Sequence, residues 1–151
     1  MRNEEWLAAL LHEIWDAHFS EVKKKNNVVA RWKGEWKNKF GHIRMLKNKD
    51  TEIGINFLFK DERVPKFIVE LTLAHELVHY MHGFHSPYPK QFKHPHKGGV
   101  VDKELRLRGY SNELIKEKLW FKEEWTQLRK GLLNETGRTH VRHVGNTFRF
   151  F

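Results

Sequence analysis

Residues 65–83 have the sequence PKFIVELTLAHELVHYMHG, whose apolar side chains recur at intervals of three and four. This spacing is typical of one face of an α-helix. The side chains that follow it are Phe67, Ile68, Leu71, Ala74, Leu77, Val78 and Met81. Pro65 suits the first position of a helix, and Gly83 is a typical C-terminal stop. The sequence therefore predicts a largely buried helix over about residues 65–82.

This helix contains the motif HExxH, formed by His75, Glu76 and His79. Residues four apart lie on one helix face, so both imidazoles can reach a single metal ion. Glu76 projects about 100° around the helix from His75, where it can reach a metal-bound water without being a ligand. Zinc peptidases activate water in this way, with the glutamate as general base. The competing interpretation is two hydrogen-bonded core histidines beside an exposed Glu76.

A catalytic zinc ion usually takes three protein ligands. The motif supplies two of them, so the third has to come from elsewhere in the chain, and several residues are candidates. His96 is favoured, since it directly precedes a predicted helix that would hold it in place. His85, shortly after the motif, is the next candidate, followed by His94 and by Glu104. Glu104 would make the protein a zincin with a Glu-type third ligand. The chain has no Cys, so His and carboxylate side chains have to hold any transition metal.

The rest of the chain predicts a small sheet and several helices. Before the motif we expect a helix over residues 4–20 with Asn3 as N-cap, and strands over 28–32, 41–46 and 51–59. After it we expect a loop over 83–98, helices over about 99–108 and 111–130, and a terminal strand or arm over 139–151. Asn48-Lys49-Asp50 is typical of a hairpin turn between the last two strands.

Together these elements predict one α+β domain over residues 1–151. The expected fold is a minimal zincin-like domain with an N-terminal helix, a three-stranded and mostly antiparallel sheet, the central HExxH helix and C-terminal helices. Its core would cover about residues 5–110, and about 111–151 would be a helical extension and arm. No apolar run is long enough to cross a membrane, and the N-terminus does not resemble a signal peptide. We therefore expect an intracellular, cytoplasmic protein without a membrane partner.

The order of these segments resembles the SprT-like metalloprotease family, whose eukaryotic members include Spartan. The segments that carry the resemblance are residues 28–32, 41–44 and 53–56, followed by the HExxH motif, and they lie within roughly residues 5–110. The resemblance implies a zinc metalloendopeptidase with His75 and His79 as Zn²⁺ ligands and Glu76 as the catalytic acid and base. The family's third ligand is a His at the start of a following helix, as His96 is here, whereas WLM-type peptidases place it where His85 lies. Spartan-like members cut proteins bound to DNA, which implies protein or peptide substrates and a DNA partner.

Charge also indicates a nucleic-acid partner. The formal net charge is +9, and residues 22–49 contain ten Lys or Arg but one acid, Glu35. Basic side chains neutralise phosphates, and exposed aromatic rings stack on unpaired bases. The predicted nucleic-acid-binding residues are Arg31, Trp32, Lys33, Trp36, Lys37 and Lys39. The competing interpretation places the aromatics in the core and the lysines on a solvated face. A nucleic-acid-binding module with a non-catalytic metal site is therefore a further hypothesis.

Overall fold

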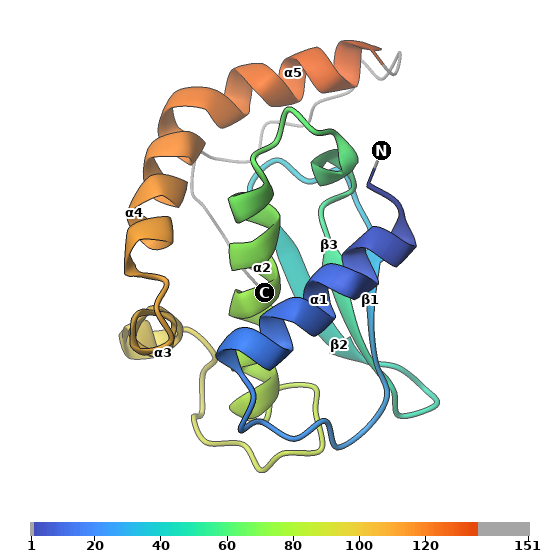
Figure 1. Cartoon of the computed structure of the whole chain (residues 1–151), viewed down its shortest axis with the longest axis vertical. Helices are drawn as coiled ribbons and strands as arrows, with labels where there is room; N and C mark the ends of the chain where they lie inside the picture. Colours follow the sequence, from blue (N-terminus) through green and yellow to red (C-terminus); the bar gives the residue numbers. More distant parts are fainter. Residues whose placement is uncertain (1, 136–151) are drawn as a thin grey trace.

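The computed structural model describes residues 2–135, which form an α+β fold, as predicted (Figure 1). The helices and strands are α1 (Glu4–His18), β1 (Val28–Trp32), β2 (Gly41–Met45), β3 (Thr51–Ile55), α2 (Lys66–Met81), α3 (Val100–Leu107), α4 (Ser111–Trp120) and α5 (Thr126–Glu135). Two short 3-10 helices, η1 (Phe57–Lys60) and η2 (Lys97–Gly99), and a π-helical turn, η3 (Phe121–Trp125), complete the described elements. The predicted terminal strand or arm over 139–151 lies outside the described residues.

The sheet is mixed, which corrects the prediction that it would be mostly antiparallel. The strand order is β1-β3-β2, with β1 parallel and β2 antiparallel to β3. A tight turn joins β2 to β3, where the N–H of Leu46 donates to the carbonyl of Asp50 at 2.8 Å. The β1–β2 connection instead crosses the end of β3, where the Asn56 side-chain amide donates to the carbonyls of Trp36 and Lys39 at 2.8 and 3.0 Å.

Helices α1 and α2 cover one face of this sheet (Figure 1). Asn3 caps α1, since its side-chain oxygen accepts a hydrogen bond from the N–H of Trp6 at 2.8 Å. The helix ends at His18, two residues before the predicted end. Its buried residues are Leu7, Leu10, Leu11, Ile14 and Trp15. The third strand is also shorter than predicted, because Asn56 caps η1 by accepting from the N–H of Leu58 at 3.0 Å.

Helix α2 is buried on nearly every side, as its apolar sequence predicts. It contacts α1, β2, β3, α3 and α4, and its residues from Leu71 to Tyr80 are all buried. The HExxH motif therefore lies on the central element of the fold. A helix in this position cannot rotate or shift without disturbing both the sheet and the C-terminal helices.

The C-terminal helices pack against an aromatic cluster. The predicted helix over 111–130 continues to Glu135 and contains the π-helical turn η3. Trp125 follows Trp120 by five positions, and a regular α-helix would turn two side chains with this offset to different faces. The π turn lets both face the core, with their ring centroids 5.4 Å apart. Phe40 and Phe59 pack edge-on against Trp125 at 5.7 and 5.4 Å, which joins α4 and α5 to the start of β2.

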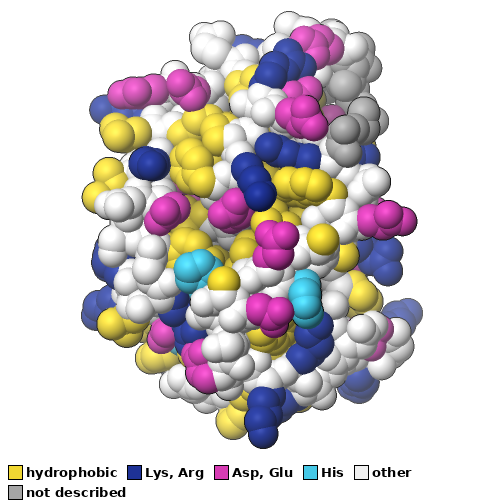
Figure 2. Space-filling model, in the orientation of Figure 1, with side chains coloured by type: hydrophobic (Ala, Val, Ile, Leu, Met, Phe, Trp, Pro, Cys, Tyr) yellow, Lys and Arg dark blue, Asp and Glu magenta, His cyan; other side chains and the backbone are white. Residues whose placement is uncertain are grey.

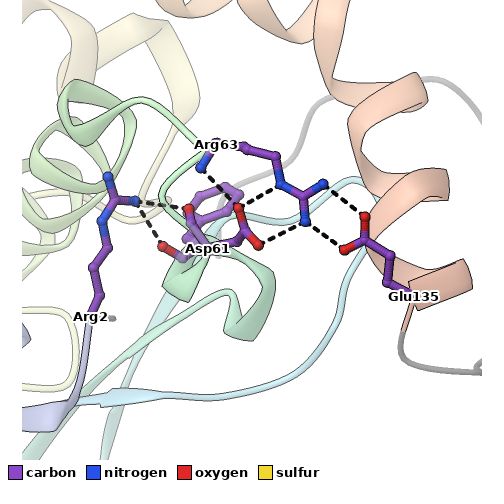
Figure 3. A network of polar contacts seen from close by, with 5 residues as sticks. Arg2, Asp61, Arg63 and Glu135 are labelled. Carbon is purple, nitrogen blue, oxygen red and sulfur yellow. Dashed lines mark hydrogen bonds and ion pairs between the residues drawn. The ribbon is translucent and has the colours of Figure 1, made fainter.

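An exposed ion-pair network ties the end of α5 to the segment before α2 (Figure 3). The guanidinium of Arg63 donates two hydrogen bonds to the Glu135 carboxylate, at 2.8 and 2.6 Å. It also donates two to Asp61, both at 2.9 Å. On the other side, Arg2 donates to the carbonyls of Phe59 and Asp61. This network links the N-terminus, the segment after η1 and α5.

Candidate metal centre

Three histidines converge at one point beside α2. His75 and His79 come from successive turns of the helix, and His96 comes from the segment before α3. The Nε2 atoms lie 3.1 Å apart for His75 and His79, 3.2 Å for His75 and His96, and 3.0 Å for His79 and His96. Tetrahedral zinc with bonds near 2.0–2.1 Å would need such atoms about 3.3 Å apart. The donor set and spacing therefore fit a zinc ion.

The surroundings keep these imidazoles neutral, which is the form that binds metals. Burial, helped by the neighbouring His79 and His96, holds the pKa of His75 well below its ordinary value. Burial and then His96 lower the pKa of His79 to about 3. Burial also lowers the pKa of His96, and the nearby Asp102 opposes this shift. Three neutral rings this close cannot satisfy one another by hydrogen bonding, whereas one cation between them accepts all three lone pairs.

The loop after α2 folds back against the end of the helix and brings His96 to His75 and His79. Gln91 donates its backbone N–H to the carbonyl of His82 at 2.9 Å and its side-chain amide to that of Met81 at 3.1 Å. Gly83, with φ +85°, makes the turn that brings Pro89 into close backbone contact. These bonds bring the chain back to the end of α2. From there the exposed segment through His96 reaches the two helix histidines.

Two glycines then reverse the chain immediately after His96. Gly98 and Gly99 have φ values of +76° and +65°, which side chains other than glycine rarely adopt. They let α3 begin at Val100, directly after η2. The predicted position of His96 before a helix is therefore confirmed, although the 3-10 helix η2 intervenes.

The other candidate ligands lie elsewhere. His85 bonds to the far end of the sheet, where its Nδ1 accepts from the N–H of Met45 at 3.4 Å. His94 is exposed and is not part of the histidine cluster. Glu104 accepts a hydrogen bond from Arg108 at 2.9 Å. Among the residues that the structure describes, only His96 joins the two helix histidines, so the Glu-type arrangement has no geometric support.

Glu76 is the fourth residue of the site and is unusual among the buried acids. Its side chain is 0% exposed, and within residues 2–135 neither carboxylate oxygen has a hydrogen-bond partner. Burial raises the pKa of Glu76 well above its ordinary value, and the positive charge of Lys39 opposes that shift. The competing interpretation required an exposed Glu76, so it is wrong on this point. A buried carboxylate without a partner is costly unless another group uses it.

Gly41 lies next to the Glu76 carboxylate and makes room for the Thr72 side chain of α2, and sequence reasoning missed it. A Cβ at Gly41 would lie 3.5 Å from Oε1 of Glu76 and 2.7 Å from Cγ2 of Thr72. Glycine at the start of β2 therefore lets the strand approach α2 closely. A glycine in a strand is a recognisable signal of close backbone approach. The sequence alone does not say which element approaches.

The structure places the predicted nucleic-acid-binding residues in three different surroundings. Trp32 is buried and stacks on Trp6, with ring centroids 6.2 Å apart, so it is not available to bases. Arg31 and Lys33 lie within 3.6 Å of the Glu52 carboxylate on the outer face of the sheet. The remaining three belong to the β1–β2 connection and are half-buried: Trp36, Lys37 and Lys39.

The face of the molecule on which α1 lies carries acidic and basic side chains interspersed with apolar ones (Figure 2). Within residues 2–135, every helix is too short or too polar to cross a membrane. Comparison of the chain with protein-family models, with curated proteins and with solved structures finds no match, so its function has to be inferred from the site itself.

Proposed function

We propose that this protein is a zinc-dependent metallopeptidase that hydrolyses peptide bonds with a metal-activated water. The observation that carries the proposal is the set of three Nε2 atoms within 3.2 Å of one another beside a buried carboxylate without a hydrogen-bond partner. The ligand set is His75, His79 and His96, and Glu76 is the general base. The resemblance to SprT-like metalloproteases supports the same assignment.

A zinc ion held by three histidines lowers the pKa of a bound water and polarises a carbonyl. The protein's own contribution is to hold the ligand rings and to move a proton. The Glu76 carboxylate accepts the proton of the attacking water and then delivers it to the leaving amine. Its burial suits this role, because a raised pKa brings a carboxylate closer to the range in which it can both accept and donate.

Among the described residues β2 is an edge strand of the sheet, and this supports an extended peptide as substrate. The carbonyl of Phe40 accepts from Asn56 of the β3 side at 2.8 Å, and backbone direction alternates along a strand. Gly41, Ile43 and Met45 therefore direct their backbone groups away from β3. His85 takes the N–H of Met45, whereas Gly41 lies beside Glu76. A peptide that pairs with this edge would pass the candidate centre.

Metal content tests the ligand set. Protein purified without a His-tag is analysed by elemental mass spectrometry, and we expect about one zinc per chain. His75→Ala and His96→Ala should lose the metal. His85→Ala and His94→Ala are matched controls on the same loop and should keep it. Absence of zinc in the wild type, even after adding zinc and dialysing, would overturn the proposed site.

Turnover of fluorescein-labelled casein tests the peptidase activity. Zinc-loaded wild type should degrade the probe, and Glu76→Gln should keep its zinc but lose turnover. The result that contradicts the proposal is equal turnover by both proteins. That result would instead favour a metal site without a catalytic role.

A second candidate function is nucleic-acid binding, favoured by the cations around Glu52. Arg31, Lys33 and Arg44 lie 3.6, 3.6 and 2.8 Å from its carboxylate, so three permanent positive charges meet one negative charge. The register places Arg31 opposite Gly54 and Arg44 opposite Glu52, which puts them on one face of the sheet. Their side chains are 54% and 53% exposed and can meet phosphates. This surface supports DNA-associated proteins as substrates.

Fluorescence anisotropy with a labelled oligo(dT) tests this second function. The double variant Arg31→Gln/Arg44→Gln should bind more weakly than the wild type. Its salt slope should fall by about 1.4, since each phosphate contact on a single strand contributes about 0.7. The control variant Lys116→Gln/Lys122→Gln removes two exposed charges from α4 and η3. Equal weakening in both variants would assign the binding to net charge alone.

A further inference from the structure

The outer edge of β1 carries backbone groups that point away from the sheet. Asn27 and Lys33, the residues on either side of the strand, direct their backbone groups towards β3 and bond to it at 2.9 and 2.8 Å. Backbone direction alternates along a strand, so the N–H and C=O groups of Val28 and Ala30 point the other way. The order β1-β3-β2 places no strand of residues 2–135 on that side.

This edge lacks most features with which proteins protect an unpaired strand. Unpaired backbone groups at an edge are a template for another strand, and charged residues, proline or a covering segment usually block them. Residues 28–30 are Val, Val and Ala. Arg31, the charged residue of the strand, lies 3.6 Å from the Glu52 carboxylate on β3. Only at the end of the strand is an outward group used, where the N–H of Trp32 donates to Glu4 at 3.4 Å.

A groove of about 520 Å³ lies between this edge and α1, which passes over β1 (Figure 1). Residues 28–31 of β1 form one wall, and residues of α1 between Glu4 and His12 form the other. Ala8 belongs to the helix wall and is exposed, so its small side chain leaves room for a neighbouring strand. The groove therefore suits an extended segment that pairs with β1.

The two ends of the groove carry opposite charges. Glu4 is exposed and lies at the end of β1, where it accepts from the N–H of Trp32. Lys24 is exposed and precedes the start of β1, with its ammonium 5.1 Å from the centroid of the Trp15 ring on α1. Both residues line the groove. Antiparallel pairing brings the end of one strand to the start of the other, so in a symmetric pair each Glu4 meets the Lys24 of the other copy.

We propose that two copies of this chain pair antiparallel through the outer edges of β1, about a two-fold axis at Val29, so that their sheets become one. Val28 of each copy then pairs with Ala30 of the other, which uses the backbone groups that point away from β3. Trp32 keeps its bond to Glu4. The opposite edge, β2, stays uncovered, so this interface does not depend on the proposed peptidase function.

Reversal of charge tests the contact between the groove ends. Sedimentation velocity of the full chain should show a dimer whose fraction rises with concentration. Glu4→Lys and Lys24→Glu should each weaken self-association about tenfold, because two attractive pairs per dimer become repulsive. A mixture of the two variants should recover dimers, since each reversed charge then meets an opposite one.

The matched controls are Glu13→Lys and Lys47→Glu, which reverse exposed charges outside the groove. Both should associate like the wild type. The proposal is overturned if the wild type is monomeric at every concentration. It is also overturned if the controls weaken association equally, or if the mixture of Glu4→Lys and Lys24→Glu does not recover dimers.

A single cysteine tests the position of the two-fold axis. The chain has no Cys, so Val29→Cys introduces a unique thiol. On the axis this residue faces its own copy in a non-hydrogen-bonded pair, whose Cα atoms lie about 4.5 Å apart, within the range that a disulfide bridges. Mild oxidation should therefore give a covalent dimer on a non-reducing gel, and adding Lys24→Glu should slow its formation. Lys47→Cys, a more exposed position, controls for random collisions, and equal cross-linking of the two single-cysteine variants overturns the proposal.

Discussion

Glu52 and Glu76 are both buried, yet their surroundings are opposite. Glu52 is 3% exposed and accepts a hydrogen bond from Arg44 at 2.8 Å, with Lys33 and His42 each at 3.6 Å. Burial by itself would raise the pKa of Glu52, but the Arg44 hydrogen bond and the charge of Lys33 outweigh it and the pKa is lowered. Glu76 has no hydrogen-bond partner within residues 2–135, and its pKa is raised.

Under the proposed function, this difference separates a structural carboxylate from a reactive one. The partners of Glu52 satisfy its charge, so the group joins β1, β2 and β3 and gains nothing by taking a proton. Glu76 lies where a carboxylate is costly to bury, on the same helix as two of the three clustered histidines. A violation of the rule that buried polar groups are paired is expected where function requires it. The comparison predicts that neutralising the two acids will have opposite consequences.

The largest expected effect is on turnover in Glu76→Gln. Removing the general base should lower kcat on labelled casein by about 10²- to 10⁴-fold, the usual contribution of general base catalysis. The urea midpoint of the metal-free protein should not fall, because glutamine removes a buried charge that has no hydrogen bond. A midpoint that falls as far as that of Glu52→Gln would show that Glu76 is a structural anchor as well.

Glu52→Gln should have the opposite effect to Glu76→Gln. It should lower the stability of the protein and leave its turnover unchanged. Loss of the charge-assisted bond from Arg44 leaves three cations around a neutral amide, which should cost about 2 kcal/mol of unfolding free energy. Urea unfolding measures this loss, and labelled casein measures the turnover of the folded protein. Glu5→Gln, an exposed change on α1, is the matched control and should be silent. Equal stability of Glu52→Gln and Glu5→Gln would contradict the anchoring role.

Glu52→Gln should also change how the unfolding free energy depends on pH, in a direction that follows from the lowered pKa of Glu52. The stability that a lowered carboxyl pKa contributes is present above the unfolded value, about 4.3, and is lost as pH falls through the folded pKa. The unfolding free energies of wild type and Glu52→Gln should therefore differ most at neutral pH. They should converge as pH falls through the folded pKa of Glu52, which lies below the unfolded value.

Glu117 tests the comparison at a buried acid away from the metal ligands. It is buried on α4, and its Oε2 has no hydrogen-bond partner within the described part of the chain. Burial, and then the charge of Asp102, raise the pKa of Glu117 to about 8. With a raised pKa, stability is highest below the unfolded value and falls as pH rises towards the folded one.

Glu117→Gln should therefore stabilise the protein increasingly from about pH 4.3 upwards and level off above pH 8. The gain at the plateau is expected to be on the order of 1 kcal/mol, because relaxation and water penetration reduce the cost of a buried charge. Urea unfolding at three pH values measures it, with exposed Glu124→Gln as control. A gain that does not change with pH would mean that the glutamine acts through packing.

Local spacing is the part of the site that the sequence could predict. HExxH sets the two proposed ligands and the proposed general base on one helix, and no other part of the chain is needed to interpret it. His96 was predictable because the glycines and the helix after it form a local pattern. The parallel pairing of β1 with β3 was not, because no local pattern sets the path of the β1–β2 connection across the end of β3.

The predicted nucleic-acid-binding residues show most clearly where prediction from the sequence fails. Strand alternation already separates Trp32 from Arg31 and Lys33, since neighbours on a strand point to opposite faces. That signal was present in the sequence, and grouping the three on one surface was wrong for Trp32. Gly41 is a different case. Its close approach to α2 depends on how β2 packs against that helix, and no spacing in the sequence carries that information.

The smallest expected effect is at Glu135, a carboxylate that is paired but exposed. Its bonds to Arg63, at 2.6 and 2.8 Å, are as short as any around Glu52. Both side chains are at least half exposed, however, and Arg63 keeps two hydrogen bonds to Asp61 when Glu135 is neutralised. Glu135→Gln should therefore shift the urea midpoint little, and high salt should abolish the difference. If this variant lost as much stability as Glu52→Gln, short ion-pair distances rather than burial would set the strength of these anchors. The contrast between Glu52 and Glu76 would then reflect the number of cationic partners alone.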